Sequence, residues 1–168
     1  MKIFSLALIS CVLVSCAGYR LGGLKPASLA RVHKIAVPMF HNATQHPRAE
    51  VIATSAVANA MVQDGTYRVS SLDHADAVLE GNLKSIDYSS IRGRRLDTLY
   101  PDELRNEVTI EWRLLDARDR TKVLASGSAG GSSQLFVSAN LQTARNNALP
   151  EALERAGEAL VSRISNGY

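Results

Sequence analysis

In the segment 106–114, polar and apolar side chains alternate strictly from Glu107 onward, and this pattern constrains the fold more than any other. The apolar positions are Val108, Ile110, Trp112 and Leu114, and the positions between them are Glu107, Thr109, Glu111 and Arg113. Such alternation is typical of a strand in an antiparallel sheet that has one face on the core and the other in water. A lone tryptophan on the apolar side normally packs beneath a helix, so we expect Trp112 in the core.

Four further segments predict strands, at residues 33–40, 67–70, 76–89 and 122–128, and residues 129–133 either continue the last strand or form a loop. In the first segment the apolar residues share one face (Ile35, Val37 and Met39). Pro38 cannot donate to a ladder, so it favours a sheet edge or a strand end. In residues 76–89 the apolar phase shifts, which predicts a β-bulge near Lys84–Ser85.

Two segments have helical periodicity. In residues 47–64 the apolar side chains recur every three or four positions (Ala49, Ala53, Ala56, Val57, Ala60 and Met61), Pro47 suits the first helical position, and Gly65 marks the end. Residues 138–165 repeat the pattern with Leu149, Leu153, Ala156, Leu160 and Ile164, and Pro150 should kink this helix or divide it in two. The order β-α-β-β-β-β-α predicts an α+β fold, in which a mostly antiparallel four- to five-stranded sheet carries both helices on one face.

The first fifteen residues have the organisation of an export signal. Lys2 supplies a positive charge, and residues 3–14 form an uncharged, largely apolar stretch. This stretch is too short for a membrane-spanning helix, which needs roughly 20 apolar residues. A buried N-terminal helix or strand is the alternative, but it would not explain why Ser15 and the glycines of residues 18–23 follow at once.

The sequence Leu13-Val14-Ser15-Cys16 resembles the lipobox of bacterial lipoproteins, in which the cysteine thiol receives a diacylglyceryl group. We therefore expect a cleaved signal peptide at residues 1–15, a lipidated N-terminus and tether at residues 16–32, and one α+β domain at residues 33–168. Because Cys11 leaves with the signal and Cys16 takes the lipid, the mature domain has no thiol, which suits export to an oxidising compartment. Diacylglycerol and an N-acyl chain on Cys16 would anchor the protein stably, since two or more chains suffice.

Composition argues against several function classes. The formal charge is only +3, aromatic residues make up 5% of the chain, and no basic run is longer than Arg92-Gly93-Arg94-Arg95, so nucleic acid is not an expected partner. There is no G-x-S-x-G elbow, and the glycines at 127, 130 and 131 lack the spacing of a phosphate loop. We expect no enzyme and no cofactor beyond the covalent lipid.

The polar residues that could suggest a site have simpler explanations. His41 and His46 flank the turn around Asn42 and could hold a metal as a pair, although an exposed loop explains them more simply. We therefore expect no metal site. Four aspartates stand at predicted strand ends, where turn chemistry accounts for them (Asp73, Asp76, Asp116 and Asp119).

Several motifs together resemble one family. The start Cys16-Ala17-Gly18-Tyr19-Arg20-Leu21 is similar to the Cys-Gly-Tyr-x-Leu/Phe opening of the LPS-assembly lipoprotein family LptE, with Ala17 inserted. Residues 35–44 resemble its first strand and Asn-x-Thr turn, and residues 75–81 resemble its third strand. Residues 144–153 resemble its final helix, although Pro150 departs from the pattern. The resemblance implies a lipoprotein anchored in the outer membrane and facing the periplasm, which sits in or beside the LptD barrel and assists delivery of lipopolysaccharide to the surface.

The loop at residues 91–102 carries the candidate contact residues, Arg92, Arg94 and Arg95. Guanidinium groups grip phosphates in bidentate fashion, so these side chains could contact lipid phosphates or an acidic barrel wall. Asp97, Asp102 and Glu103 stand nearby, which leaves a merely solvated loop as the alternative.

A second function remains open, that of a lipoprotein activator of a peptidoglycan synthase in the LpoB family, which shares the strand, Asn-x-Thr turn and helix opening. Such an activator must cross the periplasm to reach an inner-membrane enzyme. Here the tether of residues 17–32 has 16 residues. It spans about 50–60 Å when fully extended. This reach is short for the task, so we favour the role in lipopolysaccharide assembly.

Overall fold

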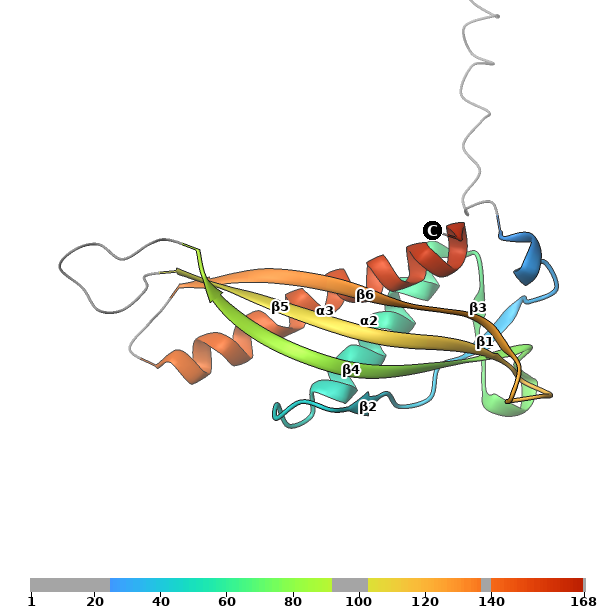
Figure 1. Ribbon diagram of the computed structural model, residues 1–168, viewed down its shortest axis with the longest axis horizontal. Helices are drawn as coiled ribbons and strands as arrows, with labels where there is room; N and C mark the ends of the chain where they lie inside the picture. Colours follow the sequence, from blue (N-terminus) through green and yellow to red (C-terminus); the bar gives the residue numbers. More distant parts are fainter. Residues whose placement is uncertain (1–24, 92–102, 137–139, 168) are drawn as a thin grey trace, which may run out of the picture.

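Three strands of equal length form the frame of the molecule. The computed structural model describes residues 25–91, 103–136 and 140–167. In it β4 (Ala77–Ser90), β5 (Glu103–Asp116) and β6 (Val123–Phe136) each have 14 residues, and they run side by side along the long axis (Figure 1). The other elements are η1 (Ala27–Leu29), β1 (Lys34–Ala36), β2 (His41–Asn42), α2 (Ala49–Asp64), β3 (Arg68–Val69), η2 (Leu72–His74) and α3 (Leu141–Asn166).

The sheet has six strands in the order β3-β1-β4-β5-β6, and β2 pairs with β4 as well. The long strands pair antiparallel, whereas β1 and β2 lie parallel to β4, and β1 lies parallel to β3. The predicted α+β class, with a mostly antiparallel sheet, is confirmed. The short strand β2 was not predicted, and it accounts for the sixth strand.

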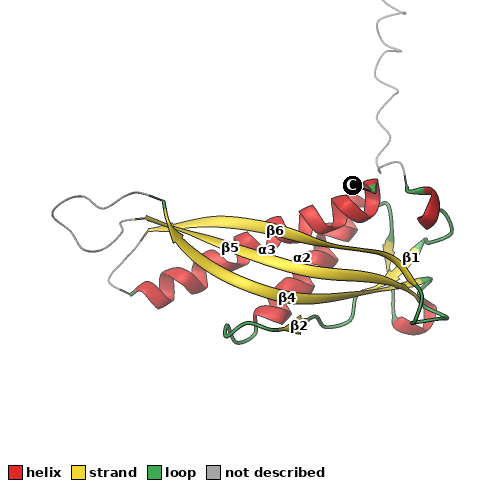
Figure 2. Cartoon of the chain, in the orientation of Figure 1, coloured by secondary structure: helices red, strands yellow, loops and turns green. Residues whose placement is uncertain are grey.

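Both helices lie on one face of the sheet, as predicted (Figure 2). The inward residues of β5 are buried, with Val108, Ile110, Trp112 and Leu114 each at most 5% exposed. They join the buried faces of α2 and α3 in a single core cluster. The alternation of residues 106–114 therefore predicted the core-facing side of the sheet correctly.

The predicted strand at residues 33–40 is wrong in its length. β1 ends at Ala36, and β2 begins only at His41. Because Pro38 has no N–H to give to a ladder, pairing with β4 stops before it. Met39 then points outward with 61% of its surface exposed, so it does not share one face with the buried Ile35 as predicted. Phe40 enters the core instead, and its ring occupies the space where a side chain on Gly81 would stand.

The irregularity predicted in β4 is confirmed at Lys84. Leu83 pairs with Ile110 and Ser85 pairs with Thr109, which leaves Lys84 as the extra residue of a bulge. β6 is longer than residues 122–128, because its glycine- and serine-rich second half continues the ladder with β5 as far as Phe136. The strand interpretation of residues 129–133 is therefore the correct one.

The predicted ends of the helices are partly confirmed. Gly65 caps α2 with φ +73°, and its N–H donates to the carbonyl of Met61. α2 begins at Ala49 rather than at Pro47, because Arg48 has φ +65° and is not helical. α3 runs unbroken from Leu141 to Asn166 through Pro150, so the predicted division is wrong. Buried residues on both sides of Pro150 (Ala148, Leu149, Ala152 and Leu153) hold the helix on the sheet although one hydrogen bond is lost.

The burial of Trp112 leads to a first prediction. The indole ring packs closely over Gly127, since a β-carbon there would lie 3.0 Å from the ring. Trp112→Ala should lower the free energy of unfolding by about 3–5 kcal/mol because it removes a buried aromatic side chain. Urea denaturation measures this loss. Arg113→Ala is the control, since its exposed ion pair with Glu80 should contribute only about 0–1 kcal/mol. Equal losses in the two variants would contradict the core assignment.

Asp76 fixes the start of β1 and leads to a pH prediction. Its Oδ2 accepts the backbone N–H groups of His33 and Lys34, both at 2.9 Å. These two bonds lower the pKa of Asp76 below its ordinary value. A carboxyl group with a lowered folded-state pKa stabilises the protein above its unfolded value of about 3.9, and the effect is lost as pH falls through the folded value.

Asp76→Ala should therefore cost about 1 kcal/mol at neutral pH, the usual scale of such hydrogen bonds. The difference from the parent protein should shrink below about pH 4. Denaturant titrations at several pH values measure it. Asp73→Ala is the control, since the exposed Asp73 of η2 makes no side-chain hydrogen bond in the described part of the chain. A cost that persists unchanged at pH 3 would contradict the role of the carboxylate.

Candidate functional site at the loop end of the sheet

The candidate site residues predicted from the sequence cannot be placed directly. Cys16, Arg92, Arg94 and Arg95 all lie outside the residues that the structure describes. Residues 92–102 connect the end of β4 to the start of β5. We therefore call the end of the sheet that carries Ser90, Glu103 and Phe136 the loop end, and the described residues there are the ones that can be examined.

A small apolar cluster covers the inner face of the loop end. Leu104, Leu135 and Ala148 are its buried members, and Tyr88, Leu141 and Ala144 pack against them. This cluster is separate from the main core. Phe136 ends β6 at the same place with 75% of its surface exposed. Phe136 is therefore an exposed apolar side chain beside this buried cluster.

The cationic side chain of Arg145 lies against this cluster. The guanidinium of Arg145, in the second turn of α3, lies over the Tyr88 ring at 4.5 Å from its centroid. The Nε of Arg145 is buried without a hydrogen-bond partner, and no carboxylate among the described residues pairs with this side chain. Burial raises the pKa of Tyr88, although the charge of Arg145 opposes the shift. Stacking on Tyr88 thus holds a positive charge that no described carboxylate neutralises.

A row of polar residues separates the loop-end cluster from the main core. Asn106 is fully buried between its strand neighbours Tyr88 and Ser133, and neither polar atom of its side chain has a partner in the described chain. Ser133 donates to the carbonyl of Ala148 at 2.7 Å. In the sequence, Asn106 could have been recognised as a polar residue at an inward position of an alternating strand.

His46 joins the loop end from the turn before α2. Its Nε2 lies 3.4 Å from the Tyr88 hydroxyl, and the two rings are 5.8 Å apart at their centroids. His41 stands in β2, and the described chain has no group of three or more histidine, cysteine, aspartate or glutamate residues that could hold a metal ion. His46 thus orients Tyr88, and the ring of Tyr88 in turn supports Arg145.

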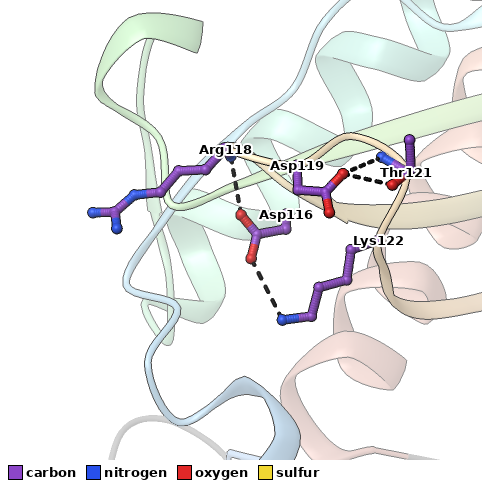
Figure 3. A network of polar contacts seen from close by, with 5 residues as sticks. All are labelled: Asp116, Arg118, Asp119, Thr121 and Lys122. Atoms are coloured by element: carbon purple, nitrogen blue, oxygen red, sulfur yellow. Dashed lines mark hydrogen bonds and ion pairs between the residues drawn. The ribbon is translucent and has the colours of Figure 1, made fainter.

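The opposite end of the sheet shows ordinary turn chemistry (Figure 3). Asp116 accepts the backbone N–H of Arg118 at 2.9 Å and pairs with Lys122 at 3.8 Å. Asp119 accepts both the N–H and the hydroxyl of Thr121, which lowers the pKa of its carboxyl group. The turn interpretation of Asp116 and Asp119 is confirmed. The side chain of Arg118 points away from this network.

A hollow of about 670 Å³ opens beside the break between β1 and β2, and it is lined in part by Met39, Glu80, Glu111 and Trp112. Its charges neutralise one another, because Glu80 pairs with Arg113 at 3.2 Å and with Arg120 at 3.8 Å, and Glu111 pairs with Lys84. The hollow therefore offers no unpaired group among these charges for a ligand.

In the part of the chain that the structure describes, no helix has both the length and the apolar character needed to span a membrane.

Solved structures share this fold at low sequence identity. Lipoprotein B from Nitrosomonas europaea is 15% identical with a TM-score of 0.52, over 88% of this chain and 90% of that one. A protein from Xanthomonas campestris is 15% identical with a TM-score of 0.52, over 79% and 82%. A minor lipoprotein from Acinetobacter baumannii is 9% identical with a TM-score of 0.51, over 80% and 94%. A search of curated proteins gave no match.

The family comparison is decisive because it covers nearly the whole domain. The model of the family described as "LptE: Lipopolysaccharide-assembly" matches residues 32–164. This range begins just before β1 and ends in the last turn of α3, so it includes every strand of the sheet and both long helices. The chain therefore belongs to the LptE family, which serves in lipopolysaccharide assembly.

Proposed function

We propose that this protein is an outer-membrane lipoprotein, acylated on Cys16 and facing the periplasm, that assists lipopolysaccharide assembly as the partner of the LptD barrel. The family match over residues 32–164 is the observation that carries this proposal. The proposed role is non-catalytic, since the protein would position a lipid and a barrel rather than transform a substrate. The same match favours it over activation of a peptidoglycan synthase.

The loop end is the surface that we assign to this role. Lipid A is an anionic amphiphile with phosphates beside acyl chains, so a surface that binds it needs cations next to apolar groups. The described residues supply both, in Arg145 over Tyr88 and in the exposed Phe136. Arg92, Arg94 and Arg95 belong to the loop that joins β4 to β5 at this end, and they would extend the same cationic surface.

Copurification tests the partnership most directly. The tagged full chain is isolated from detergent-solubilised membranes, and the bound proteins are identified. We expect a large β-barrel protein and lipopolysaccharide to copurify. Recovery of a peptidoglycan synthase without a barrel would instead support the alternative function.

The arginines of the loop give a sharper prediction. Changing Arg92, Arg94 and Arg95 together to alanine should weaken binding of lipopolysaccharide or the barrel by a few kcal/mol, because charge-assisted hydrogen bonds contribute about 1.5–3 kcal/mol each. The melting temperature should hardly change, since exposed charges contribute little to folding. Copurification and lipopolysaccharide binding are measured beside thermal unfolding.

The matched control removes three cations from the opposite end of the sheet, by changing Arg118, Arg120 and Lys122 to alanine. It alters the net charge by the same amount as the loop variant does. Only the loop variant should lose binding. If the loop variant binds both partners as the parent protein does, the loop is merely solvated and the site assignment is wrong.

A further inference from the structure

The outer edge of β6 is open along its length. β6 ends the strand order, and no described residue forms a strand beside it. Its 14 residues include no charged residue and no proline. Natural sheets protect such edges, often with lysine or proline, because the unpaired N–H and C=O groups can pair with another chain. Protection of this edge must therefore come from outside the strand.

Two arginines of α3 reach this edge. Arg155 donates from Nη1 to the carbonyl of Ser132 at 2.7 Å, and Arg163 donates from Nη1 to the carbonyl of Ser128 at 2.5 Å. In β5 the N–H and C=O groups of odd-numbered residues face β4, as the bond from Ile91 to the carbonyl of Glu103 shows. Even-numbered residues of β5 therefore bond to odd-numbered residues of β6, and Ser128 and Ser132 direct their carbonyls outward.

The spacing of the two arginines matches that of the two carbonyls. Eight residues of helix advance about 12 Å, and four residues of strand advance about 13 Å. α3 also lies directly on β6, because a β-carbon on Gly131 would stand only 2.1 Å from the carbonyl oxygen of Ala152. A second contact, with an acidic residue, fixes Arg155, whose Nη2 donates to Glu151 at 2.5 Å. Each arginine is thus held level, along the strand, with the carbonyl to which it donates.

We propose that Arg155 and Arg163 close the outer edge of β6 against pairing with β6 of a second copy of this chain. A ladder on this edge would need the same two carbonyls, so the arginine bonds and the ladder exclude each other. An antiparallel pair centred on Gly130 sets Ser128 opposite Ser132 of the second copy, with twofold symmetry. The outward side chains of β6 from Ser126 to Gln134 are small or uncharged, so the second copy meets no like charge there.

A cysteine reporter in full-length protein in membranes tests this proposal. Gly130→Cys places a thiol at the centre of the expected pair, where a β-carbon has ordinary contacts. Arg155→Met and Arg163→Met remove the donors but keep an apolar stem on the sheet. With both changes, the disulfide-linked dimer on a non-reducing gel should increase roughly tenfold, as expected for loss of about one charge-assisted hydrogen bond.

Three controls make the result specific. Arg68→Met with Arg118→Met removes the same charge from side chains that make no hydrogen bond or ion pair in the described chain, and it should leave the dimer unchanged. Thr109→Cys places the reporter in the middle of the sheet on β5, where strand pairing at the edge cannot link it. Chains without a new cysteine account for links through Cys11 and Cys16.

The proposal fails if the double methionine change gives no more dimer through the Gly130→Cys reporter than the parent arginines do. It also fails if the Thr109→Cys reporter links as strongly as the Gly130→Cys reporter, because that result indicates unfolding and general aggregation rather than edge pairing. Links from the thiol at position 130 to a different protein would show that the edge accepts another occupant, which equally overturns pairing with a second copy.

Discussion

Gly131→Ala is expected to destabilise the protein by about 3 kcal/mol, near the upper end of the usual cost of overpacking. A β-carbon at this position would lie 2.1 Å from the carbonyl oxygen of Ala152 and 2.4 Å from the backbone nitrogen of Ala156. Both atoms belong to the backbone of α3, so no side-chain rotation can relieve the overlap. The helix must move away from β6, and buried contacts made by Leu149, Leu153 and Leu160 are strained with it.

The neighbouring glycine provides the matched control. A β-carbon on Gly130 lies 3.5 Å from the carbonyl oxygen of Val108, which is an ordinary contact. Gly130→Ala should therefore be neutral, or slightly stabilising because alanine restricts the unfolded chain. Denaturant unfolding of the two variants measures the difference. Similar midpoints for Gly131→Ala and Gly130→Ala would show that α3 does not rest on β6 as described.

Cys16→Ala is expected to abolish acylation of the protein. The prediction depends on interpreting Leu13-Val14-Ser15-Cys16 as a lipobox, in which the thiol of Cys16 would receive the lipid. Metabolic labelling with palmitate should mark the parent protein and leave the variant unlabelled. The variant should remain as an unprocessed precursor or as a soluble periplasmic form.

Cys11→Ala is the matched control, because Cys11 lies inside the predicted signal and should not affect acylation. On a sucrose gradient the parent protein should travel with outer-membrane markers, since Ala17 follows the cysteine and the enterobacterial retention rule requires aspartate there. Equal palmitate labelling of the Cys16→Ala variant would disprove the lipobox. Migration with inner-membrane markers would disprove the proposed location.

The parts of the fold that were predictable from the sequence depend on local pattern. The alternation of β5 and the phase shift at Lys84 both indicate which side chains face the core. Because only one face of the sheet is buried, this pattern strongly specifies the register of the strands. Gly65 ends α2 because a single residue with positive φ is needed there. Each of these signals lies within a few residues of the feature that it determines.

The sequence was ambiguous or misleading where distant contacts decide the structure. Gly130, Gly131 and their serine neighbours are poor strand formers, yet they continue β6 because β5 pairs with them. Pro150 does not divide α3 because residues on both sides of it, among them Ala148 and Leu153, are buried against the rest of the fold. Local propensity alone could not anticipate either result.

The candidate site likewise combines features that local sequence patterns predict with features that depend on distant contacts. Cys16 was predicted from a short local motif, and the arginines from their position in a loop. The contact between Tyr88 and Arg145 joins residues of β4 and α3, and no sequence pattern links two residues so far apart. Asn106 was visible as an inward polar position, but the sequence does not show that both polar atoms of its side chain lack partners among the described residues.

The polar row at Asn106 also has a consequence for motion. It divides the apolar interior into a main part and a small part under the first turns of α3, so the two parts need not open together. Segments with few buried apolar contacts open at lower free energy than a central core does. Backbone amides of residues 144–149 should therefore exchange with deuterium well before those of residues 156–164. α3 is one continuous helix, but its first turns and its second half should thus open as two separate units.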